Sequence, residues 1–401
     1  MKKINKITAA LFLPALMLLS SCMDPIFYEI RKDVKPEKAT VSGNITSITR
    51  FTASDGSEWL YTGADKGLRR KPLKDENHGS WDEQTMPFDL ISFDFDSTSY
   101  NGEQLLTVLA NENTLYLISA EYTTTGTEGN TNPKNLHLWG KQNGGNWKKI
   151  DFNLPLGIDL ETERYISLFN VFQTNTPKYK NRHAYICRRE SVKDSEGNTS
   201  LVYKTYELKG TATPEAVTVS KLEDSDSSRP WSATYFNGGV KFFASKAVTT
   251  NETSNKDASM LYYADGDNLY YTSADGSKNK VKALEAPRKI SALSTCKDSI
   301  LIGLGDISGD STSYGGITRA VLDENGVPAS STSGFSTNAN FQLTNSYVIL
   351  TLLNATPEKA ELESAFYASI SFRGSTGLHD NIGLWSYYPK RGDDEGNWNR
   401  E

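Results

Sequence analysis

Short hydrophobic runs separated by polar turn residues dominate the chain beyond residue 43. Runs of Val, Ile, Leu, Tyr, Phe and Thr alternate with Gly, Asn, Asp and Ser, for example at residues 105–110, 114–120 and 347–353. Apolar runs of this length with such boundaries are typical of β-strands. Only residues 357–365 have the composition of a helix, about one or two turns long. The pattern therefore predicts an all-β protein.

A hairpin pattern recurs along this region. In three places a strand-like run is followed by a polar turn and a Gly-Ser-Trp or Gly-Asn-Trp sequence, which ends at Trp81, Trp147 and Trp398. A glycine supplies the turn geometry, and the tryptophan is expected to stack back on the first strand. Three further copies share this layout without the tryptophan. The apolar anchors of the six copies are Leu68, Leu136, Leu201, Leu269, Ile317 and Leu384.

The spacing of these anchors predicts a β-propeller. Successive anchors are 68, 65, 68, 48 and 67 residues apart, which leaves room for three or four strands in each interval. A single blade cannot bury both of its faces, whereas radial stacking lets each blade cover the next. We predict six blades over residues 43–401. Seven blades are the alternative count, because residues 89–153 hold an extra strand-like run. Two sandwich domains built of hairpins are the alternative.

The first 21 residues have the pattern of a secretory signal peptide. Three lysines precede an apolar run over residues 9–19, which is too short to span a bilayer as a helix. Residues 19–22, Leu-Ser-Ser-Cys, resemble the lipobox of bacterial lipoproteins. The resemblance implies that Cys22 is acylated, that residues 22–42 are the acylated N-terminus and a flexible tether, and that Met23 favours the outer membrane. An ordinary signal peptide with an incidental cysteine is the alternative.

Composition and charge exclude several classes of protein. With 37% hydrophobic and 11% aromatic residues, the chain has ample material for a large core. A mean hydropathy of −0.51 excludes a polytopic membrane protein. The net charge of −6, which becomes −9 once the signal peptide and its three lysines are removed, argues against a nucleic-acid partner. The predicted partners are the membrane, through the lipid anchor, and a glycan or a protein.

Cysteine and histidine are too sparse to suggest a disulfide scaffold or a metal centre. Cys187 and Cys296 lie in separate strand-like stretches, and nothing in their spacing requires a disulfide between them. They are predicted to be buried free thiols, and a disulfide is the alternative. The four histidines fall in four different repeats and are predicted to be isolated. They are His78, His137, His183 and His379.

The search for catalytic motifs finds only paired acids. No nucleophile elbow, zinc helix, phosphate loop or dinucleotide fingerprint is present. Asp94 and Asp96 would share one face of a strand, and Glu361 and Glu363 form a second pair. Opposite a partner, such acids could hydrolyse a glycoside, although a solvated strand face explains them as well.

One loop has the pattern of a calcium ligand set. Asp306, Ser308 and Asp310 place oxygen atoms on alternate residues, as a calcium-binding loop does. The loop lacks the glycine and the glutamate that complete an EF-hand, and an ordinary loop between strands explains it equally well. We predict neither a structural metal nor a cofactor.

Four aromatic residues are candidates for ligand binding. Trp139, Trp385, Tyr387 and Tyr270 occupy matching places on the repeated strand. Because side chains alternate between the two faces of a strand, some of these rings would point into the core and others outward. An outward ring can stack on a sugar, whereas packing between blades is the alternative. Residues 54–59 also resemble the Asp-box turn of sialidase-type propellers with a one-residue difference in spacing, and such a turn is structural.

The leader at residues 19–22, the hairpin repeats and the closing sequence of residues 383–389 together resemble uncharacterised β-propeller lipoproteins of Bacteroidetes bacteria. The resemblance implies a lipid-anchored β-propeller of the cell envelope, but it implies no particular activity. Because the face of a propeller presents many loops around a central depression, we predict a module that binds a protein or a glycan rather than an enzyme. A propeller hydrolase or lyase that acts on polysaccharide is one alternative. A structural envelope protein without a small ligand is the other.

Overall fold

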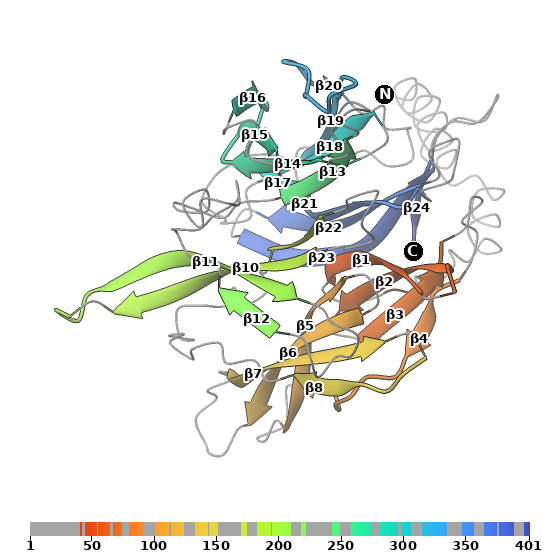
Figure 1. The fold of residues 1–401 in the computed structure, drawn as a ribbon, viewed down its shortest axis with the longest axis vertical. Helices are drawn as coiled ribbons and strands as arrows, with labels where there is room; N and C mark the ends of the chain where they lie inside the picture. Colours follow the sequence, from red (N-terminus) through yellow and green to blue (C-terminus); the bar gives the residue numbers. More distant parts are fainter. Residues whose placement is uncertain are drawn as a thin grey trace, which may run out of the picture. The chain divides into compact units, whose positions relative to one another are not determined.

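The computed structural model describes the β-strands and their nearest turns in the unit Val41–Glu401. The described residues are 41, 45–53, 55–64, 67–73, 80–90, 101–111, 114–123, 133–142, 144–150, 170–174, 183–193, 195–209, 218–221, 243–248, 258–273, 281–295, 298–305, 315–334, 347–356, 365–374, 377–388 and 397–401. Within these ranges the chain is all-β, as the sequence pattern predicts, and contains no helix (Figure 1). Residues 357–364 of the predicted short helix lie outside the described residues. Nor does this part of the chain contain a helix long and apolar enough to cross a membrane.

The strands form six antiparallel sheets of four strands, and each sheet is a meander of strands that follow one another in sequence (Figure 1). The first two sheets hold β1 (Ile45–Thr52), β2 (Glu58–Ala64), β3 (Gly67–Pro72) and β4 (Asp82–Gln84), then β5 (Asn101–Ala110), β6 (Thr114–Thr123), β7 (Pro133–Gln142) and β8 (Lys148–Ile150). The next two hold β9 (Asn170–Thr174), β10 (His183–Lys193), β11 (Thr199–Lys209) and β12 (Thr218–Lys221), then β13 (Phe243–Val248), β14 (Ala258–Asp265), β15 (Asn268–Ser273) and β16 (Val281–Glu285). The last two hold β17 (Ile290–Thr295), β18 (Ser299–Leu304), β19 (Gly316–Val321) and β20 (Ser333–Gly334), then β21 (Tyr347–Asn354), β22 (Phe366–Gly374), β23 (Gly377–Tyr388) and β24 (Asn397–Arg400).

The repeated hairpin of the sequence is the third and fourth strand of each sheet, so this prediction is confirmed. All six anchors lie on third strands, namely β3, β7, β11, β15, β19 and β23. In the turn between β7 and β8, Gly144 has a φ of 71°, a conformation that side chains other than glycine rarely adopt. The left-handed residue is thus one position before the Gly145 of the repeated Gly-Asn-Trp sequence.

Each sheet contacts the next through its first strand. Contacts run from β1 to β5, β9, β13, β17 and β21 in turn, and β21 also contacts β1. Hydroxyl groups join some of these neighbours, since Ser47 Oγ of β1 accepts a hydrogen bond from the Val108 backbone N–H of β5 at 2.7 Å. In the same way, Ser294 Oγ of β17 accepts from the Asn354 N–H of β21 at 2.8 Å. The first strands therefore form an unbroken succession of contacts from the first sheet to the sixth and back.

The hydrophobic core lies between neighbouring sheets. Leu68 of β3, Leu105 of β5 and Leu117 of β6 are all fully buried and belong to one cluster that joins the first two sheets. Similar clusters join the fourth sheet to the fifth, the fifth to the sixth and the sixth to the first. At Gly303 of β18, an added Cβ would lie 2.8 Å from Ile349 Cγ2 of β21, so only glycine allows this close approach.

The sixth and first sheets meet around one buried carboxylate. Glu401 Oε2 accepts hydrogen bonds from Lys71 Nζ at 2.8 Å and from Trp81 Nε1 at 2.6 Å. The Lys71 and Glu401 side chains are only 3% and 9% exposed. Beside them the Trp81 ring packs edge-on against Tyr367 of β22, with ring centroids 6.0 Å apart. Trp81 therefore takes part in the contact between the first and sixth sheets.

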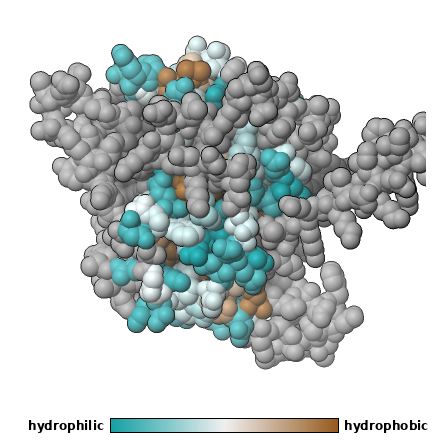
Figure 2. All heavy atoms as spheres, turned by 90° about the vertical axis from the view of Figure 1, so that its right-hand side faces the viewer, coloured by the Kyte–Doolittle hydropathy of each residue, from teal (hydrophilic) through white to brown (hydrophobic). Residues whose placement is uncertain are grey.

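The face shown in Figure 2 is mostly hydrophilic where its residues are described, with small hydrophobic spots between them. Among the described residues, Val281 and Val321 are the large hydrophobic side chains that are exposed. Surface chemistry on the described part of the chain therefore comes from polar and charged groups.

Candidate functional site

The aromatic residues predicted to bind ligand are all held by neighbouring rings or hydrogen bonds. The Tyr270 ring stacks on Tyr263 at 5.3 Å, and the Tyr387 ring lies parallel to Phe366 at 6.3 Å. Tyr387 is 8% exposed, and burial raises the pKa of its hydroxyl. Trp385 is half-buried and packs against the cluster between the fifth and sixth sheets. Tyr263 and Tyr270 are neighbours within the fourth sheet, whereas Tyr387 and Trp385 take part in the packing between the fifth and sixth sheets.

The tryptophans of the repeat differ in exposure. Trp398 is buried and contacts the Tyr387 ring at 5.2 Å, and Trp81 is buried as described above. Trp147 is half-buried, and its Nε1 donates a hydrogen bond to the Thr85 carbonyl oxygen at 2.9 Å. Trp147 thereby ties the start of β8 to the segment that follows β4.

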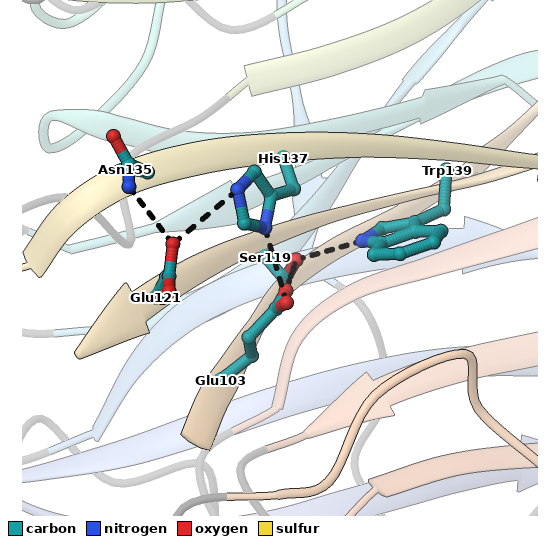
Figure 3. A network of polar contacts seen from close by, with 6 residues as sticks. All are labelled: Glu103, Ser119, Glu121, Asn135, His137 and Trp139. Carbon is teal, nitrogen blue, oxygen red and sulfur yellow. Dashed lines mark hydrogen bonds and ion pairs between the residues drawn. The ribbon is translucent and has the colours of Figure 1, made fainter. Parts of the chain in front are cut away.

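A polar network lies on one face of the second sheet, where β5 begins and β6 ends (Figure 3). The strand register pairs Glu103 of β5 with Glu121 of β6, and Ser119 of β6 with His137 of β7. Because every second residue of a strand points to the same face, these side chains and Trp139 share one side of the sheet. The sheet itself thus positions the network.

The centre of this network is an imidazole between two carboxylates (Figure 3). His137 Nδ1 lies 3.0 Å from Glu103 Oε1, and His137 Nε2 lies 3.5 Å from Glu121 Oε2. Asn135 Nδ2 also donates to Glu121 Oε2 at 2.8 Å. The sequence predicts that the four histidines lie apart from one another, and it gives no sign of the two carboxylates beside His137. Strand pairing, which one sequence does not display, brings the two glutamates to it.

The other oxygen of Glu103 is also engaged. Ser119 Oγ donates a hydrogen bond to Glu103 Oε2, and it accepts one from Trp139 Nε1 at 3.1 Å. Ser119 is therefore bonded to a carboxylate and an indole rather than to the histidine. This geometry does not suit a serine nucleophile, which needs the histidine as its base.

The network is partly open to solvent. Glu103 and His137 side chains are each 13% exposed, and Glu121 is 33% exposed. The His137 ring lies between Glu103 and Glu121 and contacts both carboxyl groups. In the described part of the chain, no group of three or more acidic, histidine or cysteine side chains is arranged to hold a metal ion. The chemistry available at this site is therefore that of two acids and a base.

Two aromatic rings and a lysine border the network. The Trp139 ring lies edge-on to His137 at 6.2 Å and contacts Phe88 at 6.1 Å. The Lys149 ammonium lies 5.6 Å from the centre of the same ring. Phe88 belongs to the segment before β5, which the hydrogen bond from Glu103 N–H to the Asp89 carbonyl oxygen at 2.9 Å holds in place. Trp139 is thus a half-buried ring beside the acids.

Several predicted site residues lie outside the described residues. Among them are Cys22, the acid pairs Asp94/Asp96 and Glu361/Glu363, the calcium candidates Asp306, Ser308 and Asp310, and also His78 and Cys296. Cys187 lies on β10, His183 begins that strand, and His379 lies on β23. Their predictions stay predictions. Among the candidates that the structure describes, Trp139 lies beside His137, and Tyr387 lies beside Trp398.

The turn that resembles an Asp-box has a structural role in the residues described. Asp55 Oδ1 accepts hydrogen bonds from Ser57 Oγ at 2.6 Å and from Ser57 N–H at 2.9 Å. The hydroxyl hydrogen bond is the largest cause of the lowered pKa of Asp55. Trp59 Nε1 donates to Ser57 Oγ at 3.0 Å, which fixes the tryptophan at the start of β2. Ser54 lies outside the described residues.

Comparison with known proteins gives distant similarity only. No protein family and no curated protein matches the sequence. Among solved structures, an α-L-arabinofuranosidase from Fusarium graminearum aligns over 86% of this chain and 93% of its own, with 12% identity and a TM-score of 0.42. A glycosyl hydrolase from Bacteroides ovatus aligns over 74% and 86%, with 11% identity and a TM-score of 0.33. Puromycin hydrolase aligns over 87% and 47%, with 9% identity and a TM-score of 0.36. Similarity of this strength assigns no activity, so function has to be argued from the residues of this chain.

Proposed function

We propose that the chain is a six-bladed β-propeller of the cell envelope, anchored by a lipid on Cys22, and that it cleaves glycans at the site around Glu103 and Glu121. The six meanders of four strands and the succession of contacts between their first strands support the propeller. The leader sequence supports the anchor.

The anchor has a direct test. Replacement of Cys22 by alanine removes the acceptor thiol and should release the protein from the membrane fraction of the producing bacterium, because acyl chains supply most of its membrane affinity. Metabolic labelling with a fatty acid should mark the wild-type chain only. Unchanged fractionation of the variant would contradict the anchor.

The observation that carries the proposed activity is the pair of carboxyl groups held on either side of His137. Hydrolysis of a glycosidic bond requires one carboxyl group to protonate the leaving oxygen and another to take a proton from water. Glu103 is assigned the base, and its two oxygens contact the Ser119 hydroxyl and His137 Nδ1. Glu121 is more exposed and suits the acid that reaches the leaving group.

The proposed reaction consumes one water molecule. Glu121 gives its proton to the glycosidic oxygen as the bond from that oxygen to the anomeric carbon breaks. The water oxygen bonds to the anomeric carbon and its proton passes to Glu103. Trp139 is the aromatic surface beside the acids on which a sugar ring can pack.

Substitution of the two glutamates tests the activity. Purified protein is incubated with a panel of plant, fungal and bacterial polysaccharides, and new reducing ends are measured. Wild-type protein should release reducing ends from at least one glycan, and Glu103→Gln and Glu121→Gln should each lower that rate at least a hundredfold. Glu83→Gln is the matched control, because Glu83 is a 71% exposed acid on β4 outside the network.

Binding without cleavage is the second candidate function. It is favoured by the engagement of both Glu103 oxygens and both His137 nitrogens, which suits a rigid recognition surface. Glycan binding that Glu121→Gln weakens, with no release of reducing ends by wild-type protein, would replace the hydrolase by a binding module.

A further inference from the structure

Two cationic side chains lie where the first and second sheets face each other. Arg70 is on β3 and Lys141 is on β7, the third strands of their sheets. The register places Arg70 opposite Tyr61 and Lys141 opposite Leu115, and both of these partners belong to the cluster that joins the two sheets. Residues opposite one another share a face, so both cations point to the contact between the sheets.

Each cation lies over a tryptophan ring. Arg70 Cζ is 4.1 Å from the centre of the Trp59 ring, and Lys141 Nζ is 5.6 Å from the centre of the Trp147 ring. Both indole N–H groups are engaged, that of Trp59 by Ser57 and that of Trp147 by the carbonyl oxygen of Thr85. The rings therefore orient the two cations without neutralising their positive charge.

Neither cation has an acidic partner in the part of the chain that the structure describes. Glu83 is paired with Arg69, which lies on the opposite face of β3. Asp82 stands opposite Arg70 in the β3–β4 register, but it is exposed and forms no ion pair with the arginine. In the described structure, the buried Nε of Arg70 also has no hydrogen-bond partner.

In the free protein, Lys141 carries its positive charge at an energetic disadvantage. Burial, and second the charge of Arg70, lower the pKa of Lys141. The two like charges repel each other, as the effect of Arg70 on Lys141 indicates, whereas an anion placed between them would be bound by both. An arginine stacked on a tryptophan presents its edge in the geometry that carboxylate and sulfate groups accept.

We propose that Arg70 and Lys141 form a subsite for the carboxylate or sulfate group of an acidic saccharide, with Trp59 and Trp147 packing against the sugar. The saccharide rests on the proposed function, whereas the preference for an anion rests on the two cations alone. Lys141 follows His137 by four residues on the same face of β7, about 13 Å along the strand. A chain of a few sugar units can therefore reach both places.

Binding of matched oligosaccharides to the purified full-length protein tests this subsite. The probes are an oligomer of galacturonic acid and a neutral galactose oligomer of the same length, compared by calorimetric titration at low salt. The acidic oligomer should bind at least tenfold more tightly, and added salt should remove that advantage. Arg70→Gln and Lys141→Gln should each weaken its binding about tenfold, while Arg69→Gln, the neighbour on the other face, should not.

The stability of the variants separates a ligand site from a structural one. Lys141→Gln should leave the thermal unfolding midpoint unchanged or raise it, because it removes a desolvated charge that has no acid partner. If Arg70→Gln does not fold, the binding of the two oligomers to Lys141→Gln is sufficient to test the subsite. Equal affinity for the two oligomers, no binding of either, or an acidic preference that survives Lys141→Gln would each overturn the subsite. Cleavage that depends on Glu103 would survive that outcome, so the two proposals can fail separately.

Discussion

The Tyr116 hydroxyl illustrates how completely this fold buries some polar groups. The side chain is fully buried on β6, and its oxygen accepts a hydrogen bond from Asn111 Nδ2 at 2.8 Å. Burial is the main reason that the pKa of Tyr116 is raised to about 12, against smaller opposite effects of hydrogen bonds to Thr114 and Asn111. The folded chain therefore requires the neutral phenol at this position.

Stability should consequently decline at alkaline pH. An unfolded tyrosine releases its proton near pH 10, whereas folded Tyr116 retains it up to about pH 12, so the unfolded state is favoured as the pH rises through this window. The contribution is complete below pH 10 and its loss amounts to at most about 3 kcal/mol. Tyr116→Phe should flatten the decline in the free energy of urea unfolding between about pH 10 and about pH 12. Tyr271→Phe, a half-buried tyrosine of β15, is the control, and an equal effect of both variants would contradict the assignment.

At the scale of strands, local patterns were sufficient for the hairpins and insufficient for the site. The turn residues and the Gly-Ser/Asn-Trp sequences are contiguous, so the third and fourth strands of the sheets could be predicted directly. Even the interval of 48 residues between Leu269 and Ile317 corresponds to a complete step from one four-stranded sheet to the next. Turn residues that are contiguous in sequence are therefore enough to predict the β-hairpins of this fold.

The network around His137 depends instead on strand register. Glu103 and Glu121 are 18 residues apart, and the β5–β6 pairing that sets them opposite each other contains an irregularity at Leu105. A shift of one residue would turn either glutamate to the other face of the sheet. The alternation of Asn135, His137 and Trp139 along β7 was a visible signal of a polar face, but nothing in one strand identifies the acids on its neighbours.

At the scale of the whole described chain, the sixth sheet is tied to the first by strands far apart in sequence. The Ser369 hydroxyl of β22 donates to the Ile45 carbonyl oxygen of β1 at 2.8 Å, and Arg50 Nη1 of β1 donates to the Thr356 carbonyl oxygen at 2.7 Å. The ion pair of Lys71 and Glu401 lies between the same two sheets and is almost fully buried. The link between these sheets therefore combines hydrogen bonds from side chains to backbone carbonyl oxygens with a buried ion pair.

Breaking that pair on one side should destabilise the whole β unit. Lys71→Met leaves the Glu401 carboxylate buried with the Trp81 indole as its remaining described donor, and loss of one partner from a buried ion pair costs about 3–5 kcal/mol. The double variant Lys71→Met/Glu401→Gln removes the charge altogether and should recover most of that loss. Lys282→Met is the control, because its pair with Glu285 is about half exposed and worth at most about 1 kcal/mol. Urea unfolding monitored by tryptophan fluorescence measures all three, and a single variant as stable as its control would mean that the charge pair does not hold the two sheets together.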